Sequence, residues 1–205
     1  MARKKSKTLG LTSAQRPPRP SLRMSGTGDV SNVAGSSALY DLNITSSPVF
    51  LALIDPTASA VINNVARNFE TYKVNRYALH YTPAVGTTTS GKVWVGYTDN
   101  PEIIYKAVGT YTNADLLAIV KTLRHNNVFP VWQSWTMNTP SLPPRRKMFS
   151  IDTSPITSAE IADRDVHGAF IVAVEGTPAS TDVGVLTASY DYALRGLQSY
   201  TATGV

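Results

Sequence analysis

Apolar and polar residues alternate along most of the chain after residue 37, and this period of two is typical of β-strands that bury one face. The run Val49–Ile54 is continuously apolar, which indicates a strand covered on both faces. The alternation changes phase at Asn75-Arg76, which predicts a β-bulge. The predicted strands lie at residues 38–54, 72–81, 92–97, 128–137, 147–151, 169–175 and 185–194.

Two segments repeat their apolar residues at helical spacing instead. Residues 58–70 place Ile62, Val65, Ala66 and Phe69 on one stripe. Residues 113–124 have a similar stripe, with Asn113 at the position of a helix cap. Because the strands are not each followed by a helix, the pattern excludes a parallel α/β sheet. It favours an antiparallel sandwich or barrel with two helical insertions, which a jelly roll accommodates.

Positive charge is concentrated at the N-terminus. The chain has 19 Lys and Arg residues against 14 Asp and Glu residues, and residues 1–24 hold seven of the cations and none of the acids. The prolines of this segment disfavour a helix and its charges repel one another, so we expect a disordered basic arm. Its cations are Arg3, Lys4, Lys5, Lys7, Arg16, Arg19 and Arg23.

A basic arm of this kind binds polyanions, because each cation that meets a phosphate releases condensed counterions. The arm has no aromatic residue, which argues against base stacking and for neutralisation of a phosphate backbone. The alternatives are a solvated tail, a targeting or nuclear-import segment, or a segment that binds an acidic membrane surface. No apolar run follows the arm, so no secretory signal peptide is expected.

Composition divides the chain into three parts. Residues 1–24 form the nucleic-acid-binding arm, residues 25–37 are rich in Gly and Ser and are expected to be a flexible hinge, and residues 38–205 form one folded domain. The absence of cysteine excludes disulfides and thiolate zinc sites. The longest apolar run is far too short to span a membrane, so no membrane partner is expected.

Candidate catalytic residues do not have the spacing of a known active-site motif in this sequence. His80, His125 and His167 are widely separated and lack the spacing of metal ligands. There is no G-x-S-x-G motif and no P-loop. The sequence therefore argues against an enzyme, including a jelly-roll enzyme such as a cupin, and against a small-molecule substrate. His80 is expected to be structural.

The order of motifs resembles the shell domain of small icosahedral plus-strand RNA virus coat proteins, the tombusvirus-like and sobemovirus-like group. A helical run leads into an aromatic strand, then a Thr-rich loop, a strand and an acidic turn follow. A helix next precedes a Trp-containing strand, and a Gly-led strand with Tyr residues closes the domain. The four stretches are ARNFETYKVNRYALHYTP (66–83), TTTSGKVWVGYTDNPE (87–102), NADLLAIVKTLRHNNVFPVWQSW (113–135) and GVLTASYDYALRG (184–196).

The resemblance implies an all-β fold, an eight-stranded antiparallel jelly-roll β-sandwich that assembles with copies of itself into a closed shell around RNA. It implies that the basic arm faces the packaged RNA. Few residues follow Leu194, so we do not expect the protruding domain that some members carry. Some DNA viruses have coat proteins of the same type, so RNA as the nucleic acid also rests on the resemblance.

The resemblance also implies a candidate metal site. Related shells hold calcium between subunits with an Asp-x-x-Asp turn, and here the turn carries Asp99 and Glu102, so the second acid differs. Calcium needs several oxygen ligands, and neighbouring chains would supply those that the turn lacks. The alternative is an Asn-Pro turn with solvated acids. Asp152 and Asp191 are secondary candidates.

Two further groups have open interpretations. The basic cluster at Arg145, Arg146 and Lys147 lines the RNA-facing wall, pairs with acids across a subunit contact, or lies in an exposed loop. Trp132 and Trp135 are three residues apart, so on a regular strand one faces the core and the other faces outward, where it can meet a neighbouring subunit.

Together these features predict a viral coat protein that forms an icosahedral shell and packages its RNA genome through the basic arm. It is expected in the virion, and in the host cytoplasm during assembly. The hinge at residues 25–37 would let identical subunits order or release the arm. The rival interpretation is a monomeric β-sandwich protein that binds nucleic acid.

Overall fold

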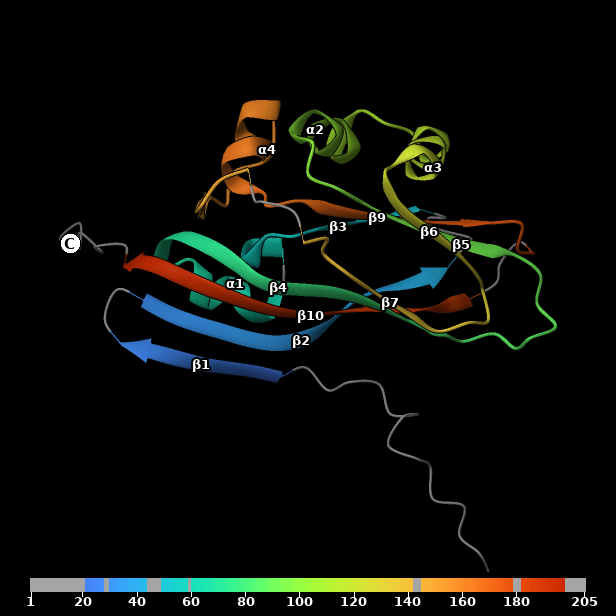
Figure 1. The fold of residues 1–205 in the computed structure, drawn as a ribbon, viewed down its shortest axis with the longest axis horizontal. Coiled ribbons are helices and arrows are strands. Elements are labelled where there is room, and N and C mark those ends of the chain that lie inside the picture. The colour runs from blue at the N-terminus through green and yellow to red at the C-terminus, as the bar shows by residue number, and fades with distance from the viewer. Residues whose placement is uncertain are drawn as a thin grey trace, which may run out of the picture.

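The computed structural model of the protein describes residues 21–27, 30–43, 49–58, 60–141, 145–178 and 182–197, and these form two antiparallel sheets packed face to face (Figure 1). The six-stranded sheet has the order β1-β2-β10-β4-β7, with β8 also paired to β4. Its strands are β1 (Ser21–Thr27), β2 (Val30–Asn43), β4 (Phe69–Pro83), β7 (Trp135–Asn138), β8 (Phe149–Ser150) and β10 (Asp182–Leu197).

The four-stranded sheet has the order β3-β9-β5-β6. Its strands are β3 (Val49–Leu53), β5 (Lys92–Thr98), β6 (His125–Pro130) and β9 (Ala169–Glu175). With β2-β10-β4-β7 as the facing layer, these strands make the eight-stranded jelly roll, and the predicted fold class is confirmed. Among the described strands, β1 and β8 lie outside these eight and extend the six-stranded sheet.

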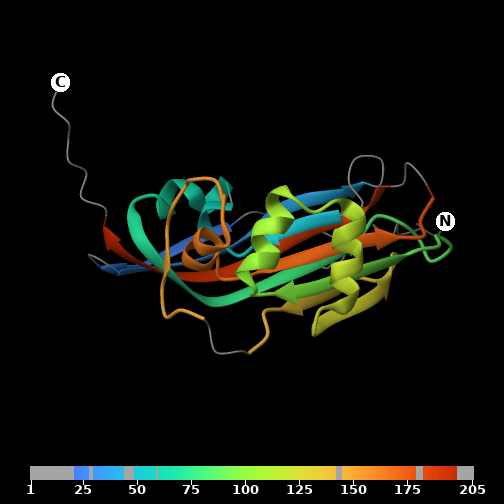
Figure 2. The same ribbon diagram turned by 90° about the horizontal axis from the view of Figure 1, so that it is seen from above.

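Helices lie in the connections between strands, most of them over the outer face of the four-stranded sheet (Figures 1 and 2). The two predicted helices are present, and α2 and α4 were not predicted. Helix α2 begins at Pro101, and Asn100 caps it. The side-chain oxygen of Asn100 accepts a hydrogen bond from the backbone N–H of Glu102. The helical elements are η2 (Pro56–Ala58), α1 (Ala60–Ala66), α2 (Pro101–Gly109), α3 (Asn113–Thr122) and α4 (Ala159–Asp165).

The cap of α3 lies one residue before the predicted position. Thr112 accepts a hydrogen bond from the backbone N–H of Asp115, and the Asp115 carboxylate accepts one from the backbone N–H of Thr112 in return, which makes a capping box. Gly96 on β5 lets α3 approach the sheet, since a Cβ there would lie 2.8 Å from the Leu123 side chain.

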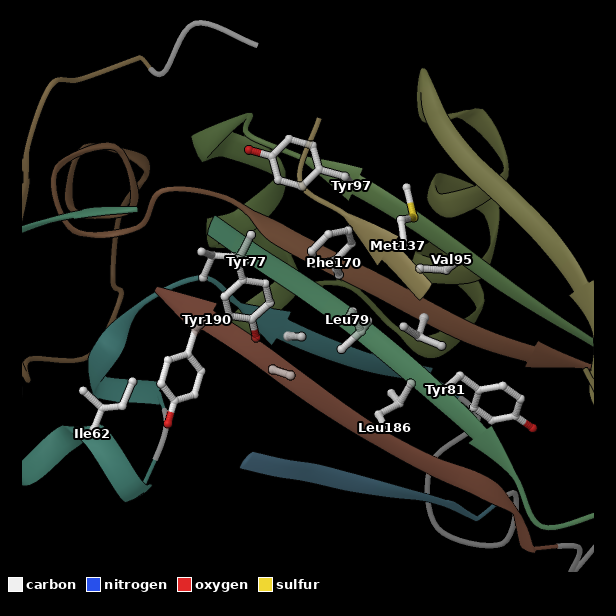
Figure 3. Close-up of a cluster of buried hydrophobic side chains, with 14 of the residues drawn as sticks. Ile62, Tyr77, Leu79, Tyr81, Val95, Tyr97, Met137, Phe170, Leu186 and Tyr190 are labelled. Carbon is white, nitrogen blue, oxygen red and sulfur yellow. The ribbon is translucent and has the colours of Figure 1, made fainter. Parts of the chain in front are cut away.

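The core between the sheets is rich in tyrosine (Figure 3). Tyr77 on β4 stacks on Phe170 on β9 with ring centroids 6.1 Å apart, and Tyr81 stacks on Trp135 at 5.5 Å. Aromatic pairs of this kind add to the free energy gained by burying their area. The inward positions of the alternating strands are thus occupied largely by tyrosine rings.

Two details of the strands test the sequence pattern. Arg76 pairs with Asp191 and Val74 pairs with Tyr192, so Asn75 is an extra residue and the predicted bulge is confirmed. The single strand predicted at residues 128–137 is wrong. It is two strands, β6 and β7, that turn at residues 131–134 and enter different sheets. The apolar and polar residues of this segment fit one strand equally well, so the pattern does not show where the chain crosses between layers.

The Gly/Ser-rich segment also differs from the predicted secondary structure. Residues 30–37, expected to form part of a hinge, belong to β2, and Ser25–Thr27 belong to β1. Low β-propensity is outweighed here because β10 offers a long antiparallel partner, with Gly35 opposite Tyr190 and Val33 opposite Tyr192. Val33 is fully buried. The first strand thus begins earlier than residue 38.

Candidate metal-binding turn and nucleic-acid interface

Most of the basic arm lies outside the described residues. This applies to Arg3, Lys4, Lys5, Lys7, Arg16 and Arg19. Arg23 lies in β1, where its backbone is in register with Ala34 of β2. Since β1 pairs with β2 alone among the described strands, the arm enters the fold at the edge of the six-stranded sheet.

The acidic turn connects β5 to α2. Thr98 ends β5, and its hydroxyl accepts a hydrogen bond from the backbone N–H of Asn100 at 3.2 Å. Glu102 lies in the first turn of α2, where a negative charge is favourable, and its carboxylate pairs with Lys106 at 2.8 Å. Asp99 is half-buried and makes no hydrogen bond or ion pair with the described residues.

These residues alone do not build a calcium site. The turn contributes two carboxylates, one of which is already paired with Lys106. Among the described residues, no group of three or more His, Cys, Asp or Glu side chains is placed to hold a metal ion. Calcium takes six to eight oxygens, so a site at this turn requires ligands from a second chain.

The basic cluster after residue 143 pairs within its own chain. Arg145 and Arg146 both contact the carboxylate of Asp163 on α4, Arg146 with its Nε at 2.9 Å. Arg145 also donates to the backbone carbonyl of Val166 at 2.9 Å. Burial opposes the charged form of Asp163, but hydrogen bonds and charge from the two arginines outweigh it and lower its pKa. Arg145 and Arg146 of the basic cluster therefore form ion pairs that hold α4 in place.

A second arginine link holds the other side of α4. Arg164 contacts Asp152 at 2.8 Å and the nearly buried Asp165 at 2.6 Å. Asp55 lies close to these acids, and burial raises its pKa to about 6 despite hydrogen bonds from Thr57. Asp152 is thus committed to a structural pair. The sequence offered no signal for this network because its acids come from separate elements: Asp55 follows β3, Asp152 follows β8 and Asp165 ends α4.

The histidines occupy separate places. His80 lies between two hydroxyls, with Thr136 at 2.9 Å and Ser189 at 2.8 Å, on the face of the six-stranded sheet away from the core. His167 packs its ring edge-on against Phe149, and its buried Nδ1 has no hydrogen-bond partner among the described residues. Burial, and then the charge of Arg145, lower the pKa of His167 to about 4, so its ring is neutral at physiological pH.

The tryptophans separate as their spacing predicts, although Trp132 lies in the turn after β6 and not on a strand. Trp135 is 6% exposed, and Trp132 is 39% exposed. Val128 on β6, an edge strand of its sheet, is also exposed. Trp94 donates its indole N–H to Glu175 at 3.0 Å.

In the described part of the chain, no helix is long and apolar enough to cross a membrane.

Comparison with known proteins agrees with this architecture. The family model described as viral coat protein (S domain) matches residues 12–199. The solved structure of tobacco necrosis virus is 16% identical, with a TM-score of 0.70 over 89% of both chains. Cocksfoot mottle virus is 17% identical, with a TM-score of 0.69 over 97% of this chain and 98% of that one.

A similar fold is found outside plant viruses. The structure of mud crab tombus-like virus is 13% identical, with a TM-score of 0.66 over 91% of this chain and 94% of that one. No curated protein sequence matches the chain significantly. At these identities the solved structures support the fold, and the family model supports the relationship.

Proposed function

The chain belongs to the viral coat protein (S domain) family, and we propose that copies of it form a closed icosahedral shell that packages RNA through the basic N-terminal arm. It is a structural protein of the virion and not an enzyme. Assembly in the host cytoplasm is part of the proposal.

The separation of charge between arm and body carries the RNA-packaging proposal. Seven cations stand in residues 1–24 without an acid, while the rest of the chain has more acids than Lys and Arg. A body without excess positive charge can pack against copies of itself, and the arm can neutralise phosphates independently of their sequence. The arm joins the body at an edge strand, β1, so it can extend without disturbing the core.

The same edge position supports a role in switching for Ser25–Thr27, the part of the predicted hinge that lies in β1, whereas residues 30–37 lie in β2 and place Val33 in the core. Strand β1 is held only through β2 among the described strands, so its release would leave the core of the sandwich intact. Subunits with identical sequences would then order this segment in some positions of the shell and release it in others. One identical path in every subunit of a particle would contradict this part of the proposal.

Calcium binding at the acidic turn is a further part of the proposal. Asp99 is not engaged by the described residues of its own chain, and Glu102 is exposed and able to leave Lys106. A neighbouring chain would complete the ligand set between subunits. Calcium would there link two chains and neutralise acids that otherwise repel.

The first experiment expresses the full chain, separates it by size and records absorbance at 260 and 280 nm beside negative-stain images. Closed particles whose nucleic acid, once extracted, is digested by RNase but not by DNase support the proposal. A monomer that binds nucleic acid would instead support the rival β-sandwich binding protein. DNase-sensitive contents would assign a DNA genome.

The role of the arm is tested by replacing its seven cations with glutamine in the full-length chain. We expect assembly with loss of packaged RNA. A matched control carries residues 2–20, which precede β1, in shuffled order, and it should package RNA normally because phosphate neutralisation does not depend on order. If the glutamine variant packages as much RNA as the wild type, the arm is not the packaging element.

A further inference from the structure

The outer edge of β4 has a gap in its hydrogen-bonded ladder. Along this edge β4 pairs with β8 at Thr71 and Tyr72, and with β7 from Ala78 to Tyr81. Residues 73–76 between these pairings have no strand partner on this side among the described residues. Asn75, the bulge residue, lies within the gap. A bulge beside an unpaired edge leaves backbone and side chains available to a ligand.

A pocket of about 310 Å³ lies against this gap. Lys73 and Arg76 line it from β4, Asn138 lines it from the end of β7, Ser141 from the segment that follows, and His167 from the segment after α4. The pocket is therefore built from three parts of the chain that the fold brings together. Its polar side chains carry an ammonium, a guanidinium, two amides, three hydroxyls and an imidazole, all of which can donate hydrogen bonds.

The two cations are not used by the fold. Lys73 and Arg76 are exposed and make no ion pair with the described residues, unlike Arg145, Arg146 and Arg164. Asp191 is opposite Arg76 in the ladder, but its carboxylate accepts a hydrogen bond from the Asn75 amide at 3.2 Å instead. Asp191 keeps its negative charge in this hydrogen bond, but it forms no ion pair with Arg76 among the described residues.

His167 also lines the pocket. Its Nδ1 is buried without a hydrogen-bond partner among the described residues, so a ligand in the pocket meets other atoms of this residue. The ring is neutral at physiological pH and adds no positive charge to the pocket. Arg145 adds positive potential beside the ring, and Asp99 adds a negative charge there.

We propose that this pocket binds a phosphate group of the packaged RNA, with Lys73 and Arg76 as the cationic contacts. The inference rests on the proposed function, and it adds to the arm a fixed contact on the folded body. An anion fits better than a cation because the pocket itself is lined by two cations and no acid. The surface beyond it continues as hydroxyl groups around His80, which suit a sugar–phosphate chain.

The test measures binding of an unstructured RNA oligonucleotide to the full-length chain across a range of salt concentrations. The test variant carries Lys73→Met and Arg76→Met. The control variant carries Lys92→Met and Arg124→Met, which removes two exposed cations outside the pocket. We expect the test variant to lower the slope of log affinity against log salt by about 1.4, or about 25-fold in affinity at 0.1 M salt relative to 1 M.

The outcomes separate this inference from the proposed function. A smaller slope in the test variant but not in the control supports the pocket, as do photo-crosslinks from 4-thiouridine RNA to residues 73–76. Equal slopes in both variants, with crosslinks confined to the arm, overturn the pocket and leave arm-driven packaging intact. Failure of the wild-type chain to bind RNA overturns both. Circular dichroism checks that each variant is folded.

Discussion

The hydroxyl of Tyr72 on β4 lies 2.7 Å from the backbone carbonyl oxygen of Asp165 at the end of α4. It is also 3.0 Å from the carbonyl oxygen of Ile54, and it accepts a hydrogen bond from the backbone N–H of His167. One buried hydroxyl therefore joins the six-stranded sheet, the end of β3 and the segment that carries His167.

Replacing Tyr72 with phenylalanine should destabilise the fold by about 1–3 kcal/mol, because the carbonyl of Asp165 loses its hydroxyl donor, while the backbone N–H of His167 keeps its hydrogen bond to the carbonyl of Ile54. Denaturant unfolding measures the change. Tyr105→Phe on α2 is the control, since that hydroxyl makes no hydrogen bond with the described residues, and it should change stability by less than about 0.5 kcal/mol. Equal effects of the two substitutions would show that the hydroxyl of Tyr72 has no special role.

Asp55 makes stability depend on pH in an unusual direction. Its pKa is raised to about 6, mainly by burial, so the folded state holds its proton more tightly than the unfolded state. Stability is therefore lost as pH rises from about 4 to about 6, by about 3 kcal/mol in total. Asp55→Asn should remove this loss. The variant should therefore have a higher free energy of unfolding than the wild type at pH 7 but not at pH 4.

Asp115 serves as a control because its pKa is shifted in the opposite direction. Hydrogen bonds from Thr112 lower the pKa of this exposed acid, so its contribution is present above its unfolded pKa and disappears as pH falls. Asp115→Asn should therefore lose stability at pH 7 and resemble the wild type at low pH. Thermal unfolding curves from about pH 2 to pH 7 compare both variants, because the contribution of Asp115 is lost only below its unfolded pKa of about 3.9. A parallel pH profile for Asp55→Asn and the wild type would contradict the role of Asp55.

The sequence predicts the strands and the phase of their buried faces because alternation is a local property. The bulge at Asn75 and the separation of Trp132 from Trp135 follow from spacing alone. The pattern does not show the division of residues 128–137 between two sheets, because the apolar and polar positions on both sides of the turn also fit a single strand. It also does not show that Gly35 lies in a strand, since that depends on the distant partner Tyr190.

Site residues are likewise predictable from the sequence only where they lie close together along the chain. The basic arm is visible in the sequence because its charges are adjacent, and Asp99 and Glu102 are visible because one turn contains them. The pairing of Arg145 with Asp163 and the place of His167 beside Lys73 depend on how α4 packs. No sequence spacing encodes those contacts. A basic cluster that binds its own chain therefore has the same sequence signature as one that binds a partner.

Asp163 should be important for stability because two arginines converge on it. Asp163→Asn weakens its contacts with Arg145 and Arg146, and we expect a loss of about 1–2 kcal/mol at neutral pH. Glu102→Gln is the matched control, since it breaks the exposed helical pair with Lys106 and should cost about 0.5 kcal/mol or less. A loss no larger than that of the control would mean that the arginines find other partners.

The proposed calcium link is tested at Asp99. In assembled particles, Asp99→Asn should lower the temperature at which the shell opens, and it should make that temperature insensitive to a calcium chelator. Wild-type particles should lose thermal stability when the chelator is added. Identical behaviour of wild-type particles with and without chelator would remove calcium from the turn, and the stability of the isolated subunit serves as the reference.

Trp132 and Trp135 should separate assembly from folding. Trp135 is buried and stacks on Tyr81 and Phe129, so Trp135→Ala should destabilise the subunit by about 3–5 kcal/mol. Trp132 is exposed near the open edge of β6, and a large exposed aromatic side chain there fits a contact between subunits. Trp132→Ser should therefore leave the free energy of unfolding within about 0.5 kcal/mol but reduce the yield of particles. Normal particle yield from Trp132→Ser would place the subunit contact on another surface.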